Sequence, residues 1–177
     1  IDLICKNKDI VVDQTDNNGY NCLYYATYYG RLKVVKHLKE KWFVPYCRSN
    51  NGTTCLHVAV RRGYSKLVHF YLKKRKQSEK LEEEANFDVG HFNRMKNWEN
   101  MIEPDEQKND GGMNAVFIAI KEKNLEMLKI LRHYGADFSM SVTVGKGQTF
   151  LPILLACKTG KVEIVQFILD NANNEKD

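Results

Sequence analysis

The chain has 177 residues, which is enough for one domain or a short array of repeats with a hydrophobic core. Hydrophobic residues make up 43% and charged residues 28%, a composition typical of a folded protein that excludes a disordered tail. Three prolines and eleven glycines exclude collagen-like and proline-rich architectures. No apolar run approaches the roughly 20 residues that span a bilayer, and we expect no signal peptide.

The net charge of +5 is unevenly distributed along the chain. Residues 31–76 carry 13 bases and one acid, whereas residues 77–108 carry nine acids and four bases. Solvated helix faces account for most charge of this kind, although clustered cations also bind nucleic acids and anionic lipids. Because no groove-reading helix motif or RNA module is present, the sequence disfavours a nucleic-acid partner and leaves anionic membrane contact as an alternative.

The five cysteines indicate a reducing compartment. Their number is odd, they are widely spaced, and no Cys-x-x-Cys pair occurs, so a disulfide framework is not expected. We therefore expect a cytoplasmic location, with nuclear or membrane association through a longer chain as an alternative. The first residue is Ile1 rather than Met, which suggests a segment of a longer protein.

Four similar segments follow one another along the chain. Residues 19–26 align with residues 52–59 at an offset of 33, and further copies begin near residues 112 and 151. Each copy predicts a short first helix and a second helix with an apolar stripe, and stacked copies bury the apolar faces that one helix pair leaves open. The predicted first helices cover residues 22–29, 55–62, 115–122 and 152–159.

A glycine separates the two helices in three of the four copies, at Gly30, Gly63 and Gly160. Glycine adopts the left-handed conformation that ends many helices without a steric penalty. Lys123 occupies this position in the third copy, so we expect either strain or a shifted turn there, with Asn124 as a compensating residue.

Two short motifs and the period together identify a family. Residues 54–59 read Thr-Cys-Leu-His-Val-Ala, residues 135–137 read Gly-Ala-Asp, and Pro152 begins a first helix. These features resemble the Thr-Pro-Leu-His-x-Ala signature and the Gly-Ala-Asp tripeptide of the ankyrin repeat family, over roughly residues 10–72 and 109–170. The resemblance implies an all-α solenoid of about four helix-turn-helix repeats with β-hairpin loops and a helical insertion between the second and third repeats.

The register of the repeats divides the chain into six expected segments. They are the end of a preceding partial repeat (residues 1–15), two repeats (16–48 and 49–76), an acidic and partly helical insertion (77–108), a third repeat (109–141), and a fourth repeat with an extended hairpin and a polar tail (142–177).

The insertion contains two predicted helical stretches. Residues 73–85 are strong helix formers and extend the preceding second helix, and residues 91–102 place Phe92, Met95 and Trp98 at helical spacing. These apolar side chains either pack back onto the stack or form a secondary contact for a partner.

The family resemblance also implies where a partner docks. In ankyrin repeats, partners usually contact a concave face formed by hairpin tips and by variable positions of the first helices. Tyrosine and arginine, which are enriched among interface hot spots, occur at several of these positions. An ordinary solvated surface is the competing interpretation. The candidate partner-binding residues are Tyr20, Tyr28, Tyr29, Arg61, Arg62, Met113, Lys121 and Lys158.

Nothing in the sequence indicates catalysis. The five histidines and five cysteines lack metal-ligand spacing, so no metal or cofactor is expected. His57 stands at the signature histidine, for which the resemblance implies a structural imidazole that bridges backbone groups. We therefore predict a non-enzymatic protein-protein interaction module, or scaffold, whose protein partner the sequence does not name. Two alternatives remain: a regulatory ankyrin domain of a larger membrane channel, acyltransferase or other enzyme, and a host-directed effector.

Overall fold

The computed structural model describes residues 14–41, 44, 49–76, 114–139, 141–144 and 148–172. The chain divides into two compact units, Ile1–Leu67 (unit 1) and Val68–Asp177 (unit 2). The division falls within a helix of the second repeat, and each unit is considered separately below.

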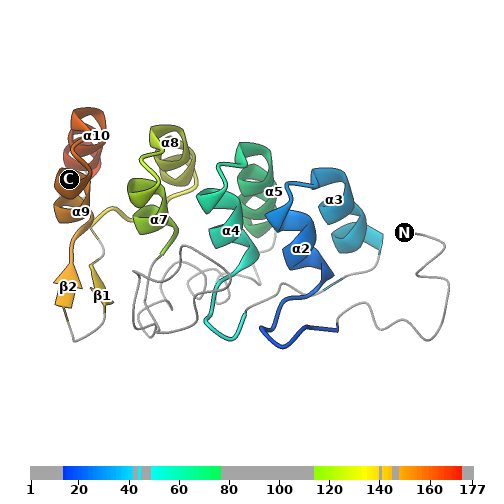
Figure 1. The fold of residues 1–177 in the computed structure, drawn as a ribbon. Coiled ribbons are helices and arrows are strands. Elements are labelled where there is room, and N and C mark those ends of the chain that lie inside the picture. Colours follow the sequence, from blue (N-terminus) through cyan, green and yellow to red (C-terminus); the bar gives the residue numbers. More distant parts are fainter. Residues whose placement is uncertain are drawn as a thin grey trace. The chain divides into compact units, whose positions relative to one another are not determined.

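The described residues of unit 1 form three complete helices and the start of a fourth. They are α2 (Cys22–Tyr28), α3 (Leu32–Lys41), α4 (Cys55–Arg61) and the beginning of α5 (Ser65–Lys76). Helix α2 packs against both α3 and α4, as Figure 1 shows. The side chains that pack between these helices are almost completely buried, and they include Leu23, Val35, Leu38, Leu56 and Val60.

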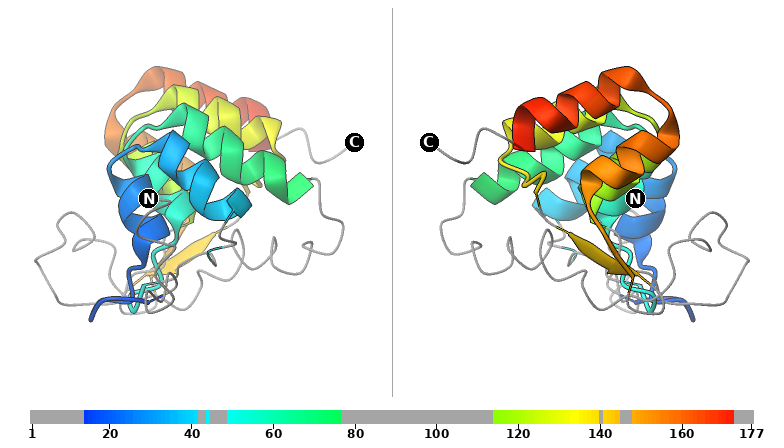
Figure 2. Two further views of the ribbon diagram at one scale, coloured as in Figure 1. Left: turned by 90° about the vertical axis from the view of Figure 1, so that its right-hand side faces the viewer. Right: turned by 90° about the vertical axis from the view of Figure 1, so that its left-hand side faces the viewer.

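Unit 2 repeats this arrangement twice. Helices α7 (Ala115–Lys121) and α8 (Leu125–His133) form one pair, and α9 (Pro152–Thr159) and α10 (Val162–Ala172) form the next. Helix α7 packs against α9, and α8 and α10 lie on the same side of these two helices (Figures 1 and 2). The first helices (α7 and α9) and the second helices (α8 and α10) therefore form separate layers, as expected for stacked helix pairs.

A two-stranded hairpin precedes α9. Strand β1 (Val142–Val144) pairs in antiparallel fashion with β2 (Gln148–Phe150), and Thr143 lies opposite Thr149. Phe138 is buried before this hairpin, and its ring contacts the Phe167 ring of α10 edge to face at 5.6 Å. This contact joins the loop before the hairpin to the last helix of the unit.

The first helices begin where the sequence predicts because polar residues cap them. The side chains of Asn21, Thr54 and Asn114 accept hydrogen bonds from the backbone N–H groups of Tyr24, His57 and Phe117, respectively. Each bond satisfies a backbone donor that the first turn of a helix leaves without a partner. Leu151 precedes α9 without a side-chain cap, and Pro152 takes the first helical position instead. All four helices begin at the predicted residue and end within one residue of the predicted end.

The turns between paired helices have the same backbone conformation in all four copies, including the third copy, which has no glycine there. Gly30, Gly63 and Gly160 have φ angles of 68°, 70° and 72°, and Lys123 adopts the same left-handed conformation with φ of 54°. The turn has therefore not shifted, and the lysine backbone carries the strain. Asn124 caps the next helix, since its side chain accepts a hydrogen bond from the Met127 N–H at 3.1 Å.

The expected all-α class is confirmed, because helices dominate the described residues and the strands form one short hairpin within them. No helix among these residues is both long and apolar enough to cross a membrane. Several predictions lie outside the described residues: the partial repeat before residue 14, the continuation of α5 beyond Lys76, the insertion at residues 77–108, and the polar tail after Ala172.

Candidate functional site

The hairpin before α2 is organised by the carboxylate of Asp16. Its Oδ1 atom accepts hydrogen bonds from the backbone N–H groups of Asn18 at 2.9 Å and Tyr20 at 2.8 Å. Its Oδ2 atom accepts a 2.8 Å bond from the Tyr25 hydroxyl, which comes from the first turn of α2. The Tyr20 N–H chiefly, with help from Tyr25 and Asn18, outweighs desolvation and lowers the pKa of Asp16. The hairpin is thus tied to the helix that follows it.

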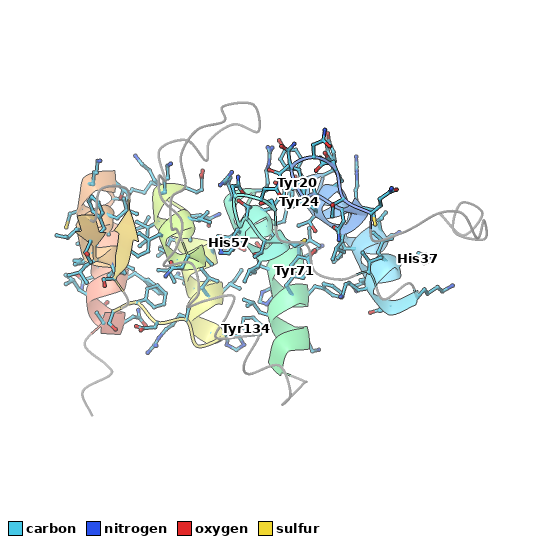
Figure 3. All side chains as sticks on the ribbon, turned by 90° about the horizontal axis from the view of Figure 1, so that it is seen from below. Tyr20, Tyr24, His37, His57, Tyr71 and Tyr134 are labelled. Atoms are coloured by element: carbon cyan, nitrogen blue, oxygen red, sulfur yellow. The ribbon has the colours of Figure 1, made fainter. Side chains whose placement is uncertain are left out.

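Five tyrosines gather on this hairpin and on α2. The Tyr20 and Tyr24 rings are stacked with centroids 3.9 Å apart, and Figure 3 shows these two side chains next to each other. Tyr24 also lies beside Tyr28 at 6.3 Å, and Tyr28 meets Tyr29 edge to face at 5.2 Å. The edge of Tyr25 faces the Tyr20 ring at 6.1 Å. Offset-stacked and edge-to-face pairs are the preferred geometries of aromatic rings, so the cluster supports itself.

The tyrosines differ in exposure, which separates supporting from accessible rings. Tyr24 is 7% exposed, and burial, followed by the neighbouring Tyr20, raises its pKa. Tyr20 and Tyr28 are half-buried, and Tyr29 is 60% exposed at the C-cap of α2. Tyr24 is therefore the buried ring against which Tyr20 and Tyr28 pack. Tyr29 has the largest exposed fraction of the five tyrosines.

Two arginines from the end of α4 join the tyrosines. The guanidinium carbon of Arg62 lies 4.1 Å from the centroid of the Tyr28 ring, which is a cation–π contact. Arg61 is half-buried, and its positive charge acts on the Tyr24 hydroxyl by opposing the rise in its pKa. The predicted tyrosines and arginines are therefore close together within unit 1, most directly Arg62 and Tyr28. We call Tyr20, Tyr28, Tyr29, Arg61 and Arg62 the tyrosine–arginine surface.

The second hairpin has its own internal network. The Ser49 hydroxyl accepts a 2.9 Å hydrogen bond from the Thr53 N–H, and the side-chain oxygen of Asn51 accepts from the same N–H at 3.1 Å. Asn50 at the tip donates through its backbone N–H to the Asn18 carbonyl at 2.9 Å. The two hairpins of unit 1 are thereby joined, which limits their independent motion.

His57 lies inside unit 1 and caps a helix. Its side chain is fully buried, and its Nδ1 atom accepts a 3.2 Å hydrogen bond from the Thr54 N–H. The same nitrogen lies 2.6 Å from the Thr54 hydroxyl oxygen. Together with the threonine cap, this forms a reciprocal capping box at the start of α4. The imidazole thus stabilises the start of α4 from a buried position.

The remaining candidates do not join this surface within the described residues of unit 1. Lys121 is half-buried at the end of α7, and Lys158 is exposed on α9, so both belong to unit 2. Met113 and the predicted secondary contact of Phe92, Met95 and Trp98 lie outside the described residues. No group of three or more His, Cys, Asp or Glu residues suited to a metal ion occurs in the part of the chain that the structure describes.

Three lysines of α3 differ in their exposure. Lys33 and Lys36 are exposed. Lys39 is half-buried, and its Nζ atom donates a 2.8 Å hydrogen bond to the Val44 carbonyl. Its ammonium group therefore binds the loop after the helix, so Lys39 is less available to a partner than Lys33 and Lys36.

Asp16, Tyr24 and Tyr25 are not among the predicted site residues. The predicted residues occupy the partner-contacting positions of an ankyrin repeat, and these three residues lie at other positions. An available signal was the acidic residue three positions before Gly19, because Asp and Asn at the start of a turn commonly accept backbone hydrogen bonds.

Comparison with known proteins agrees with the helix-pair architecture. The family model of ankyrin repeats (three copies) matches residues 1–82. No curated protein matches the chain.

Proposed function

We propose that this chain, which carries ankyrin repeats, is a non-catalytic protein-binding module and that the tyrosine–arginine surface of unit 1 contacts its partner. Ankyrin repeats are generally protein-protein interaction modules. The observation that carries the choice of surface is the Arg62 guanidinium held over the Tyr28 ring within a connected cluster of tyrosines.

The surface is suited to binding because its side chains are already ordered. Ordering a side chain that has many rotamers on binding costs about 0.5–1.5 kcal/mol. The stacking of Tyr20 on Tyr24 and of Arg62 on Tyr28 restricts these side chains before a partner arrives. The hydrogen bonds of Asp16 hold the hairpin that carries Tyr20. A partner would therefore meet a preformed surface.

The residue types also favour a protein partner. Tyrosine and arginine combine a large apolar contact area with hydrogen-bond donors, and they are enriched among residues whose truncation weakens interfaces by 2 kcal/mol or more. Tyr29 is 60% exposed and Arg62 is exposed, so both are available to a partner. These two residues are the natural targets for a test, because their removal disturbs the core least.

The test compares proteins captured from a cell extract by immobilised wild-type chain and by the double variant Tyr29→Ala with Arg62→Ala. We expect capture of the specific partner to fall at least about tenfold in the double variant. The matched control is Lys33→Ala with Lys36→Ala, which also removes exposed side chains from unit 1 but leaves the tyrosine–arginine surface intact. Thermal unfolding of all three proteins shows whether the variants remain folded.

Equal capture by the wild-type chain and a folded double variant would refute the proposed surface. Equal loss in the lysine control would also refute it, because the effect would then follow from the general positive charge. The proposal predicts that the tyrosine–arginine double variant loses capture of the partner and that the lysine double variant retains it.

A further inference from the structure

The described part of unit 1 is strongly basic. Up to Leu67 it contains eight lysines and arginines and two acidic residues, Asp16 and Glu40. The Asp16 carboxylate already accepts three hydrogen bonds from the hairpin and from Tyr25. Over the whole of Ile1–Leu67 the sequence has eleven lysines and arginines and five acidic residues, so unit 1 is basic and favours a partner with an excess of carboxylates.

Arg62 is the cation of this unit best placed to receive such a group. Its backbone is fixed at the C-cap of α4, where its N–H donates to the Val58 carbonyl at 2.9 Å. Its exposed guanidinium lies over the Tyr28 ring, and it forms no ion pair with a carboxylate among the described residues. A guanidinium that covers a ring still has N–H donors along its edge, which match the two oxygens of a carboxylate.

An apolar surface adjoins this cation. The Tyr28 ring, which Arg62 covers, contacts the ring of Tyr29 edge to face at 5.2 Å. Tyr29 is 60% exposed, so a partner side chain can pack against it. The cation and the exposed ring are thus linked through one shared residue, Tyr28.

We infer that the partner segment recognised by this surface is an acidic peptide. One of its carboxylates pairs with the Arg62 guanidinium, and an apolar or aromatic side chain next to that carboxylate packs on the Tyr29 ring. This inference rests on the proposed function, because it names the chemical class of the partner for the same surface.

The ring geometry favours a peptide over single-stranded nucleic acid. Nucleic-acid platforms need several open aromatic faces on which successive bases stack. Here Tyr20 and Tyr24 stack on each other at 3.9 Å, and Arg62 covers one face of Tyr28. The two most exposed rings, Tyr25 (44%) and Tyr29 (60%), meet Tyr20 and Tyr28 edge to face, an arrangement that suits single side chains better than a row of stacked bases.

The experiment selects binders to the full chain from a random 12-residue peptide library displayed on phage. We expect enriched sequences to contain Asp or Glu beside a Leu, Phe, Tyr or Trp residue. A synthetic peptide of the enriched sequence should lose at least about tenfold in affinity when its acids are replaced by Asn or Gln. The Arg62→Gln variant should show a similar loss with the acidic peptide, and Lys36→Gln, as the matched control, should bind nearly as the wild type does.

Selection without an excess of Asp and Glu, or equal affinity for the acidic and amide peptides, would overturn the inference. Tighter binding of a 12-nucleotide oligothymidine that is lost in Arg62→Gln would overturn it in favour of nucleic acid. The capture experiment with Tyr29→Ala and Arg62→Ala is independent of peptide charge. Its success together with a neutral peptide consensus would retain the proposed function and reject only the acidic ligand.

Discussion

The side-chain amide of Asn50 donates a 2.8 Å hydrogen bond to the carbonyl oxygen of Asn17, which lies 33 residues earlier in the chain. This separation equals the repeat period, so the bond joins the same region of two successive hairpins. Gly19 permits the close approach, because a Cβ atom there would lie 2.8 Å from the Asn50 side-chain oxygen and the φ angle is +81°. The link holds together the two hairpins that lead into the helices of the tyrosine–arginine surface.

Replacing Asn50 by Ala should lower the free energy of unfolding by about 1 kcal/mol, because one exposed side-chain hydrogen bond is lost and the backbone bond to Asn18 remains. Urea unfolding measures this change. The matched control is Asn17→Ala, which keeps the accepting carbonyl and should change stability by less than about 0.5 kcal/mol. Equal destabilisation of the two variants would show that the link does not stabilise the hairpins.

Replacing Lys123 by Gly should stabilise the chain. Its φ of 54° is unfavourable for a residue with a Cβ atom, whereas glycine accepts it at three equivalent turns. The gain should be about 0.5–1 kcal/mol, since relief of strain exceeds the entropy that glycine adds to the unfolded chain. The Lys161 ammonium group donates to the backbone carbonyl of Lys123, and the substitution retains that acceptor. Thermal or urea unfolding gives the change in stability.

The neighbouring residue provides the control for this substitution. Glu122 has a φ of −73°, so Glu122→Gly removes no strain and should destabilise the chain by about 0.5–1 kcal/mol. If both glycine variants changed stability in the same direction, the conformation of Lys123 would not be the cause.

The stability of the first hairpin should depend on pH through Asp16. Hydrogen bonds, led by that from the Tyr20 N–H, lower the pKa of the folded-state carboxylate. A lowered folded-state pKa means that the stabilising contribution is complete above the ordinary aspartate pKa of about 4. It is lost as the pH falls through the lowered value. The difference in unfolding free energy between the wild type and Asp16→Asn should therefore be larger at pH 6 than at pH 2.5.

Nuclear magnetic resonance titration of the Asp16 carboxyl group tests whether these hydrogen bonds lower its pKa. Tyr25→Phe removes one donor, because the Tyr25 hydroxyl bonds to Oδ2 at 2.8 Å, and it should move the pKa of Asp16 back toward the ordinary value. Tyr29→Phe removes a tyrosine hydroxyl at the other end of α2 and should leave this pKa unchanged. A rise of the same size in both variants would exclude the specific hydrogen bond.

The helix boundaries could be predicted because their causes are local. Asn21, Thr54 and Asn114 stand immediately before the first helices, and their side chains bond to backbone groups three residues away. The glycines between the two helices of a pair act through their own backbone freedom. Residues that act within one turn of their own position leave a readable signal in the sequence.

Lys123 shows the limit of this local reasoning. The missing glycine suggested strain or a shifted turn, and the sequence did not distinguish between them. The chain keeps the turn, because the following Asn124 caps α8 and the packing of α7 against α8 holds both ends. Tertiary packing can impose a backbone conformation that the residue itself disfavours.

The amino-acid order alone was sufficient for the repeat period, the helix pairs and the residue types of the candidate surface, since these depend on spacing and on short-range hydrogen bonds. The placement of Arg62 over Tyr28, the stack of Tyr20 on Tyr24 and the bond from Asn50 to Asn17 became visible only in the folded chain. Side-chain rotamers and the approach of separate hairpins set these contacts. Those depend on how helices α2 and α4 pack, which a pattern along one chain does not specify.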